Sequence, residues 1–472
     1  MDSFPSDMLK EFSALIWYDT ENGRKQRGDA APPSGRAGFF DLDLPRGGMH
    51  LIAGIQDEIL RLHAMGLLDR LLEDKTTRAH ILWATDAYED RGPEWRRDRE
   101  ITAALITGEN SSVIKTRARK ALEQQAARTR HHAEVFTPLA VCARMVSVMD
   151  AAWFGTGDHF PPPGAAGSIR FTKKRNWRRY VDARRLEITC GEAPYLVTRY
   201  DAATGEALPI AARVGLLDRK LRAVNENAAD ETEWRKWTLR AFQATYGYEF
   251  QGDNVLIARV NLLMTFEEYL YARWKRKPTA EEYRTVANVI AWNIWQMDGL
   301  TGAVPYCLRG AWREANLFEP DEPEPLLEET PLQPRCRIYD WRRKNSLDYM
   351  DVNTGGRNMK FDFIIGNPPY QEETTETASQ SNGQKPQKNI FHYFQIEADK
   401  LAAKGSVLIY PGGRWIHRSG KGLRKFGLAQ INDPHLKRII FYPNSQELFP
   451  GIAIADGLTI VVKDMLKTPP RI

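Results

Sequence analysis

The sequence predicts an α/β protein built around a mostly parallel β-sheet. Short apolar runs, of the kind found in strands that are buried on both faces, recur along the chain. Stretches with helical periodicity, such as residues 139–150 and 255–263, lie between them and suit the crossovers that parallel strands require. The runs that read as strands are residues 184–188, 246–249, 337–341, 361–365, 405–411, 438–442 and 458–462.

Length and composition set broad limits on the domain organisation. With 472 residues, of which 42% are hydrophobic, the chain can bury a large core, and two or three domains are expected. We expect a mainly helical N-terminal domain over residues 1–130, where the apolar residues of 55–71 fall on one helix face. A second domain is expected over residues 131–472, with helical insertions at about 206–245 and 265–330.

Two stretches of the N-terminal part carry narrower expectations. Residues 113–130 are predicted to form a basic helix. Residues 79–86 read as a strand ending in an acid, which invites comparison with nucleases. Because no matching Asp/Glu-x-Lys follows, a packing role is the preferred interpretation.

Charge and cysteine content narrow the possible partners. A net charge of +5 is too small for a polycation, although basic and aromatic residues cluster at 173–185, 273–277, 342–344 and 414–425. Such mixtures suit phosphate contact and base stacking, and equally suit a solvated surface. Four widely spaced cysteines, without a Cys-x-x-Cys pair, argue against a structural zinc and for a reducing compartment. With no signal peptide and no apolar run near a membrane span in length, we expect a cytoplasmic protein without a membrane partner or metal.

The most informative stretch is residues 361–370, Phe-Asp-Phe-Ile-Ile-Gly-Asn-Pro-Pro-Tyr. An apolar strand ends in a glycine, and Pro368 and Pro369 then fix a rigid, extended corner. At the carboxyl end of a strand in an α/β sheet, such a corner lies where ligands bind. The Asn367 side-chain oxygen and the Pro368 main-chain carbonyl are suited to accept both hydrogens of an exocyclic amine, and Tyr370 offers a ring for stacking. An ordinary turn built on two prolines is the alternative.

Asn367-Pro368-Pro369-Tyr370 resembles motif IV of the S-adenosylmethionine-dependent amino-methyltransferases, above all of the DNA adenine-N6 methyltransferases. The resemblance runs from about residue 134 to 463. It implies a Rossmann-like sheet of seven strands with the last one antiparallel, and S-adenosylmethionine as cofactor. It also implies that these four residues hold the target amine and are the catalytic residues.

Motif X of the same family is matched ahead of the corner. Residues 134–138 are similar to it, and in the family this turn lies against the methionine part of the cofactor. The matched positions, and therefore the expected cofactor contacts, are Phe136, Thr137 and Pro138. Thr137 with Pro138 is also a common helix start, with threonine as N-cap and proline at the first helical position.

Motif I is matched by residues 184–196, where a strand runs into a tight turn of small residues and a helix start suited to a nucleotide-like ligand. Glu192 stands where the family has a small polar residue, and Ala193 where it has a second glycine. A plain strand-to-helix turn is the alternative reading. The residues to which the resemblance assigns cofactor contact are Glu187, Cys190, Gly191 and Tyr195.

Glu249 and Asn345 complete the expected cofactor contacts. Glu249 ends a strand and matches motif II, where a carboxylate offers two acceptor oxygens to the two hydroxyls of a ribose. Residues 345–347, Asn-Ser-Leu, are similar to motif III, which implies contact between Asn345 and the adenine end of the cofactor. A simple turn is equally compatible with them. Residues 296–300 form a loop without a chemical assignment.

The motif order X, I, II, III, IV, VIII is that of the γ-class DNA adenine methyltransferases, with motif VIII at residues 444–457. The resemblance implies methyl transfer to the N6 amino group of an adenine flipped out of double-stranded DNA. The chain ends shortly after the last expected strand, where the class has a target-recognition domain. Specificity is therefore expected from a second subunit, from a missing C-terminal segment, or from residues 1–130. A methylase subunit of a restriction-modification or phage-defence system, with a separate specificity or restriction subunit, is the preferred interpretation. The alternatives are a catalytically impaired DNA-binding subunit and an amino-methyltransferase acting on RNA or on protein glutamine.

Overall fold

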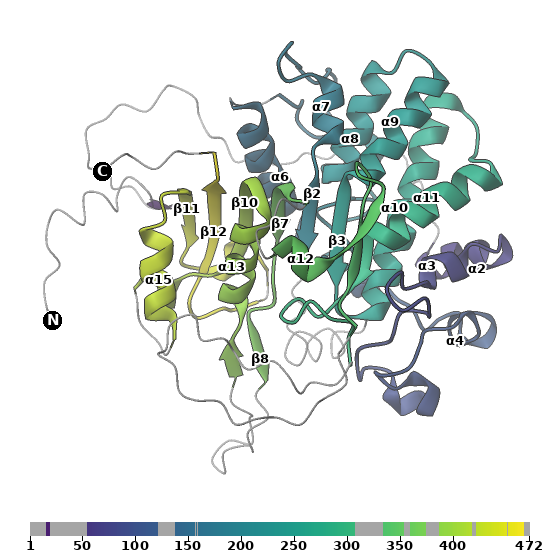
Figure 1. The fold of residues 1–472 in the computed structure, drawn as a ribbon, viewed down its shortest axis with the longest axis horizontal. Helices are drawn as coiled ribbons and strands as arrows, with labels where there is room; N and C mark the ends of the chain where they lie inside the picture. Colours follow the sequence, from purple (N-terminus) through teal and green to yellow (C-terminus); the bar gives the residue numbers. More distant parts are fainter. Residues whose placement is uncertain are drawn as a thin grey trace, which may run out of the picture.

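The centre of the molecule is a mixed β-sheet with helices on both faces (Figure 1). The strands of this sheet follow the order β1-β11-β12-β10-β7-β2-β3-β4 in the described part of the chain. β12 is antiparallel to β10 and β11, and the other neighbouring pairs are parallel. The computed structural model describes residues 16–18, 54–120, 137–155, 157, 159–306, 334–353, 359–373, 387–417, 422–450 and 452–466.

Seven strands of this sheet, all except β1, form the predicted mostly parallel sheet with an antiparallel last strand, so the predicted fold class is confirmed. β1 is a further edge strand beside β11, which the sequence pattern does not predict. The strands of the sheet are β1 (Ile16–Tyr18), β2 (Arg185–Ile188), β3 (Thr245–Glu249), β4 (Ile294–Gln296), β7 (Phe361–Gly366), β10 (Ala402–Pro411), β11 (Leu436–Tyr442) and β12 (Leu458–Asp464).

One predicted strand lies outside the sheet, and one strand of the sheet is not predicted. Residues 337–341 form β5 (Arg337–Asp340), which pairs with β6 (Asn345–Asp348) in a separate antiparallel hairpin. The sheet contains β4 in its place, within the predicted helical insertion 265–330. β4 has three residues and directly follows α11 (Ala280–Asn293), so its sequence reads as the continuation of a helix.

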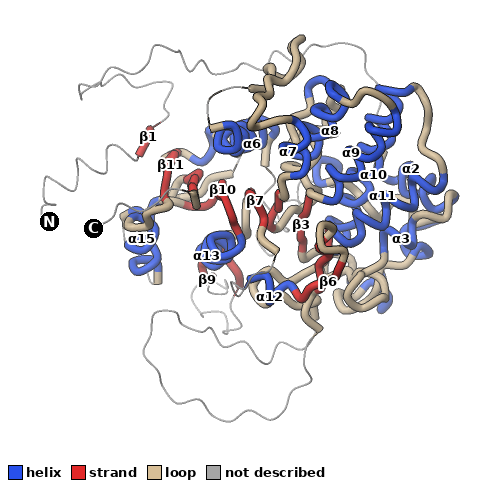
Figure 2. Tube along the Cα trace, turned by 45° about the horizontal axis from the view of Figure 1, so that its top comes forward, coloured by secondary structure: helices blue, strands red, loops and turns tan. Residues whose placement is uncertain are grey.

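Helices cover both faces of the sheet, and alternate strand residues point into two hydrophobic cores (Figure 2). On β7, Ile365 belongs to the first core and Ile364 to the second. The helices around the first core are α6 (Leu139–Phe154), α7 (Trp177–Asp182), α8 (Leu216–Asn227), α9 (Glu231–Gln243), α10 (Gly252–Trp274) and α11. Those around the second are α12 (Tyr349–Asn353), α13 (Phe391–Leu401), α14 (Gly413–Ile416) and α15 (Leu423–Ile431).

The N-terminal part is helical where its apolar pattern predicts a helix. α2 (Ile55–Ala64) and α3 (Leu68–Leu72) cover the predicted stretch 55–71 and contact α10 and α11. Residues 79–86 make isolated bridges and do not form a strand. Residues of these segments share one hydrophobic core with α10 and α11. The division into domains at residue 130 stays a prediction.

The predicted helix 113–130 is wrong over its described part. Residues 113–120 hold the short 3-10 turn η4 (Arg117–Arg119) in place of an α-helix, and 121–130 lie outside the described residues. The remaining short elements are α4 (Ala103–Ile106), η1 (Glu89–Arg91), η2 (Pro93–Trp95), η3 (Gly108–Asn110), η5 (Ile210–Ala212), η6 (Ser445–Glu447), β8 (Gln371–Glu373) and β9 (Gln387–Asn389).

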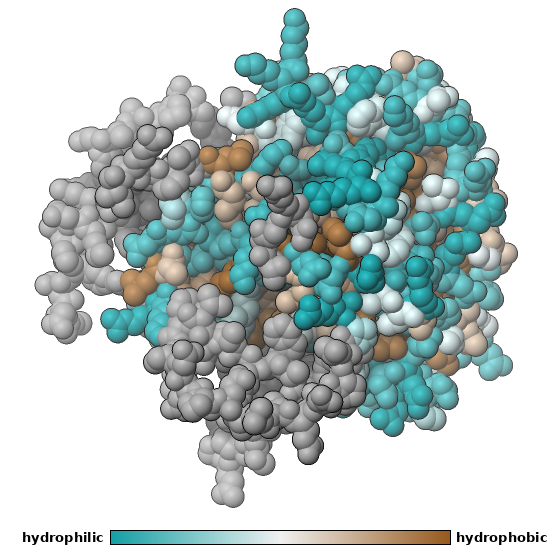
Figure 3. Space-filling model, in the orientation of Figure 1, coloured by the Kyte–Doolittle hydropathy of each residue, from teal (hydrophilic) through white to brown (hydrophobic). Residues whose placement is uncertain are grey.

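Hydrophilic side chains cover most of the described surface on the face drawn in Figure 3, and hydrophobic residues appear there in small, separate groups. In the described part of the chain, every helix is too short or too polar to cross a membrane.

Strand register fixes where the functional loops emerge. Ile188 of β2 pairs with Gly366 of β7, and Glu249 of β3 pairs with Gln296 of β4. Neighbouring parallel strands therefore end on the same side of the sheet. We call the side at which β2, β3, β4 and β7 end the carboxyl edge. The opposite side, at which these strands begin, is the amino edge.

Candidate active site

The carboxyl edge brings the proline corner and the motif I turn into contact. Asn367 directly follows β7, and Thr189 directly follows the neighbouring strand β2. The Thr189 hydroxyl lies 3.4 Å from the main-chain oxygen of Asn367 and 2.8 Å from that of Ile188. Two motifs that are far apart in the sequence therefore meet at one point.

The Asn367 side chain is the centre of a small hydrogen-bond network. Its Oδ1 accepts a hydrogen bond from the Tyr370 hydroxyl at 2.8 Å, and its Nδ2 donates to the Thr137 hydroxyl at 3.3 Å. Thr137 is buried at the start of α6, so the motif X residue reaches the corner as well. Pro138, next to it, is the N-cap of α6, so the expected helix start with Thr137 as N-cap is wrong by one residue. Phe136, the third expected motif X contact, lies outside the described residues.

The corner itself is firmly held. Pro368 is buried, while Pro369 and Tyr370 are half-buried. The Tyr370 side chain packs against both hydrophobic cores, and its main-chain oxygen accepts a hydrogen bond from the backbone N–H of Ile390. Burial raises the pKa of Tyr370, so its hydroxyl stays protonated and is available as a donor.

The motif I turn has an unusual backbone. Thr189, Gly191 and Ala193 adopt positive φ angles of 47°, 53° and 65°. For a β-branched threonine this conformation is a genuine outlier, and for alanine it costs about 1–2 kcal/mol. Ala193 thus keeps the left-handed backbone that a glycine adopts without cost. Strain of this kind concentrates at functional sites, where the surrounding structure holds it in place.

Glu187 and Tyr195 hold this turn against β2. The buried Glu187 carboxylate accepts hydrogen bonds from the backbone N–H groups of Tyr195 at 3.4 Å and Leu196 at 3.1 Å. Burial, helped by the charge of Glu249, raises the pKa of Glu187 well above its usual value. The Tyr195 ring is buried, and its hydroxyl lies 2.9 Å from the sulfur of Met145 in α6.

Glu249 joins the ends of β2 and β3. One carboxylate oxygen accepts a hydrogen bond from the backbone N–H of Gly191 at 2.9 Å, and the other accepts from that of Gln251 at 3.1 Å. Cys190, just after β2, also joins the two strands: its backbone N–H donates to the main-chain oxygen of Tyr248 in β3. Burial raises the pKa of the Cys190 thiol, so this side chain acts as a small apolar residue.

Asp298 also lies at the carboxyl edge of the sheet, although no motif in the sequence singles it out. It lies two positions beyond β4, in the loop 296–300, and the preceding Met297 donates its backbone N–H to the main-chain oxygen of Glu249. Its half-buried carboxylate accepts the backbone N–H of Leu300 at 2.9 Å. The signal available in the sequence was a short apolar run ending in an acid, the same pattern that identifies Glu249.

Asn345 does not join these residues. It is exposed and pairs with Asp340 at the end of the β5–β6 hairpin. Asp340 accepts a hydrogen bond from Arg184, which directly precedes β2, so Asn345 lies toward the amino edge of the sheet. The structure therefore places Asn345 away from the other expected cofactor contacts, whereas Asp298, two residues after β4, lies at the carboxyl edge with them.

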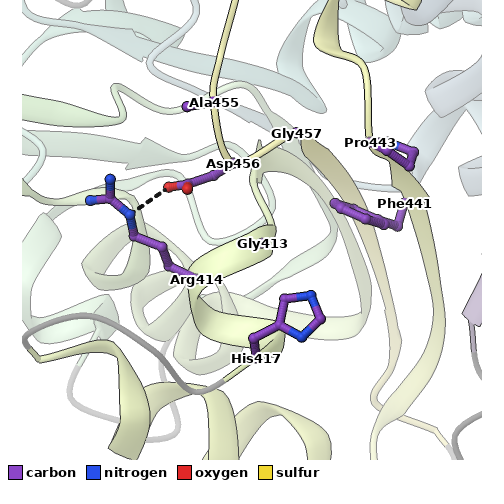
Figure 4. Close-up of a pocket in the computed structure, with 8 residues that line it drawn as sticks. All are labelled: Gly413, Arg414, His417, Phe441, Pro443, Ala455, Asp456 and Gly457. Atoms are coloured by element: carbon purple, nitrogen blue, oxygen red, sulfur yellow. Dashed lines mark ion pairs between the residues drawn. The ribbon is translucent and has the colours of Figure 1, made fainter.

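A second feature of the carboxyl side is an open cavity of about 360 Å³, drawn in Figure 4. It lies where β10 and β11 end and β12 begins. In Figure 4 the Phe441 ring and the His417 imidazole face the same space, and Arg414 forms a 3.0 Å ion pair with Asp456 at its side. Pro443 completes the wall beside Phe441. The cavity thus offers aromatic, cationic and acidic groups.

Comparison with known proteins agrees with the resemblance drawn from the motifs. Residues 243–449 match the Eco57I restriction-modification methylase family. An "Uncharacterized adenine-specific methylase" of Mycoplasma pneumoniae is 31% identical over 121 residues, which are 25% of this chain and 28% of that relative. The chain thus matches little more than a quarter of this relative's length. The resemblance to adenine methyltransferases is confirmed over the matched residues.

Solved structures of restriction-modification proteins are similar to this chain at low sequence identity. The EcoKI M protein of a type I restriction enzyme is 12% identical, with 70% of this chain and 44% of that chain covered and a TM-score of 0.32. The type IIL restriction-modification enzyme MmeI, solved in complex with DNA, is 12% identical, with 88% and 51% covered and a TM-score of 0.37.

Proposed function

We propose that this chain, whose residues 243–449 are similar to the Eco57I restriction-modification methylases, is an adenine-specific DNA methyltransferase that uses S-adenosylmethionine. The observation that carries the proposal is the contact between two motifs: the Thr189 hydroxyl lies 3.4 Å from the main chain of Asn367. A target amine held by the corner would thus lie next to a ligand held by the motif I turn. Methyl transfer requires this adjacency.

The corner is suited to an exocyclic amine on a planar ring. Asn367 Oδ1 and the main-chain carbonyl of Pro368 are the two proposed acceptors, and the Tyr370 ring is the stacking surface. Asn367 Oδ1 accepts from the Tyr370 hydroxyl here, and we expect the amine to take the place of that hydroxyl. The amine attacks first and loses its proton afterwards, so positioning by these groups contributes most of the rate. The Tyr370 ring also stabilises positive charge that develops on the base.

The residues at the ends of β2, β3 and β4 fit S-adenosylmethionine. The Glu249 carboxylate suits the ribose hydroxyls, the turn at Gly191 suits close approach of the cofactor, and Asp298 is an acceptor for its adenine amino group. The bound cofactor supplies a methyl group on a sulfonium. Glu187 and Tyr195 hold the turn in shape, and Thr137 connects it to the corner through Asn367.

The cavity beside Arg414 supports a nucleic-acid substrate. Phe441 lies three strand spacings from β7, which corresponds to about 14 Å across the sheet. A nucleotide next to the target base on the same DNA strand would lie within this distance of about 14 Å. Its base would stack on Phe441 or His417, and its phosphate would contact Arg414. A separate specificity or restriction subunit stays a prediction.

A methylation assay with a matched pair of asparagine variants tests the proposal. The purified protein and labelled S-adenosylmethionine are incubated with double-stranded DNA, single-stranded DNA, RNA or protein, and the product is digested to identify N6-methyladenine. Asn367→Ala should abolish transfer to DNA while cofactor binding, measured by calorimetry, persists. Asn345→Ala removes the same side chain at the amino edge and should leave the activity unchanged. Methylation of RNA or protein alone, or cofactor binding lost in Asn367→Ala, would contradict the assigned roles.

A further inference from the structure

The N-terminal segment from residue 79 to residue 120, which we call the N-terminal cover, lies against the carboxyl edge of the sheet. It includes α4, which lies at the lower right of the molecule in Figure 1. Its contacts fall on the last residue of β4 and on residues shortly after the ends of β2 and β3. These are the loops that carry the proposed cofactor contacts.

The first contacts are made by the backbone of the cover. Gln296, the last residue of β4, accepts a hydrogen bond from the Leu82 N–H and donates one to the Leu82 carbonyl, both at 2.8 Å. The backbone N–H of Gly252, at the start of α10, donates to the Trp83 carbonyl at 3.0 Å. A Cβ at residue 252 would lie 1.9 Å from the Leu82 oxygen, so only glycine permits this approach.

The second contact is a buried cluster on Asp253. One Asp253 carboxylate oxygen accepts hydrogen bonds from the Tyr88 hydroxyl at 2.8 Å and from Lys120 Nζ at 3.1 Å. The side chains of Lys120 and Asp253 are almost fully buried. Burying a carboxylate that lacks one of its partners costs free energy, so this cluster holds Tyr88 and the C-terminal end of the cover at one point.

The third contact explains one departure from the family motif. Glu192, where a small polar residue is usual, is buried in the motif I turn. Its carboxylate accepts the backbone N–H of Arg117 at 2.6 Å and the Tyr200 hydroxyl at 2.8 Å. A small residue would not reach the cover. Gly191, the preceding residue, donates its N–H to Glu249, so the cover acts on the turn next to the proposed ribose contact.

We propose that the N-terminal cover forms one wall of the cofactor half of the active site, and that Tyr88, Asp253 and Glu192 are positioning residues for cofactor binding. The inference rests on the proposed function, because the ligand concerned is S-adenosylmethionine. The cover holds the loops after β2 and β3 in the arrangement that binds the cofactor. It leaves the corner at Asn367, on the β7 side, for the substrate.

Two tyrosine variants with matched chemistry test the proposal. Tyr88→Phe removes a hydroxyl that donates to a carboxylate already paired with a cation, Asp253 with Lys120. Tyr283→Phe makes the same change on α11, where the hydroxyl donates at 2.6 Å to Glu267, which is paired with Arg61. S-adenosylmethionine binding is measured by calorimetry, and protein stability by urea denaturation. Tyr88→Phe should weaken cofactor binding by about threefold to tenfold, while Tyr283→Phe should not change it.

Hydrogen exchange in the cofactor-free protein separates this inference from the proposed function. The amides of Gly191 and Gln251, which bond to Glu249, should exchange faster in Tyr88→Phe than in the wild type or in Tyr283→Phe. Equal exchange in all three proteins, or equal cofactor affinity in the two variants, would overturn the role of the cover. Absence of cofactor binding in the wild type would overturn the proposed function itself.

Discussion

Removal of one oxygen from Tyr370 separates the two proposed roles of this residue. The hydroxyl donates to Asn367 Oδ1 at 2.8 Å, and that oxygen is also the proposed acceptor for the target amine. A hydrogen bond of this kind contributes about 0.5–1.5 kcal/mol net, and we expect the amine to displace it on binding. Tyr370→Phe keeps the ring and removes the competitor, so we expect KM for DNA to fall by about twofold to twelvefold.

The assay compares Tyr370→Phe with Tyr370→Ala. The alanine variant also loses the stacking surface, which contributes about 1–3 kcal/mol per base, so its affinity for DNA should fall. Methylation kinetics over a range of DNA concentrations measure both KM values, and urea denaturation measures the free energy of unfolding. Tyr370→Phe should lose about 0.5–1.5 kcal/mol of stability. A rise in KM of the same size in both variants would show that the hydroxyl contacts the substrate and does not compete with it.

Two further predictions concern pH and salt. Burial raises the pKa of Glu397, which accepts hydrogen bonds from Tyr248 and Tyr349, from 4.5 to about 7. Its contribution to stability is therefore full below pH 4.5 and is lost as pH rises through 7, a change of about 3 kcal/mol. Glu397→Gln should remove this loss in urea denaturation at pH 5 and pH 8; an unchanged pH dependence would contradict it. Arg414→Ala should lower the salt slope of DNA binding by about one, whereas Arg342→Ala, whose arginine pairs with Asp182 at the amino edge, should not. Equal slopes for these two variants would exclude a phosphate contact at Arg414.

The corner can be recognised from the sequence because its chemistry is local. The apolar run specifies a strand. The glycine and the two prolines after it specify a rigid loop at the end of that strand, whatever residues surround them, and β7 does end at Gly366. Glu249 is identifiable for the same reason, as an acid at the end of a strand. Features that depend on residues adjacent along the chain are therefore accessible from the amino-acid sequence alone.

The errors arise where distant contacts decide the structure. β4 is too short to show a strand pattern after α11, so the sequence does not place Asp298 at the carboxyl edge, and Asn345 is expected there instead. Glu192 reads in the sequence as a departure from motif I, because its hydrogen-bond partner, the backbone of Arg117, lies 75 positions away. The side-chain role of such residues is set by tertiary contacts, which a single sequence does not reveal.

The pairing of β2 with β7 sets the distance over which the methyl group would be transferred. The methyl donor and the acceptor would be carried by loops of adjacent strands, in register at Ile188 and Gly366. Their separation is then inherited from the interval between two paired backbones, about 4.8 Å. Side chains on the loops after β2 and β7 can therefore change during evolution, altering affinity or target choice, without changing the distance that the methyl group must cross.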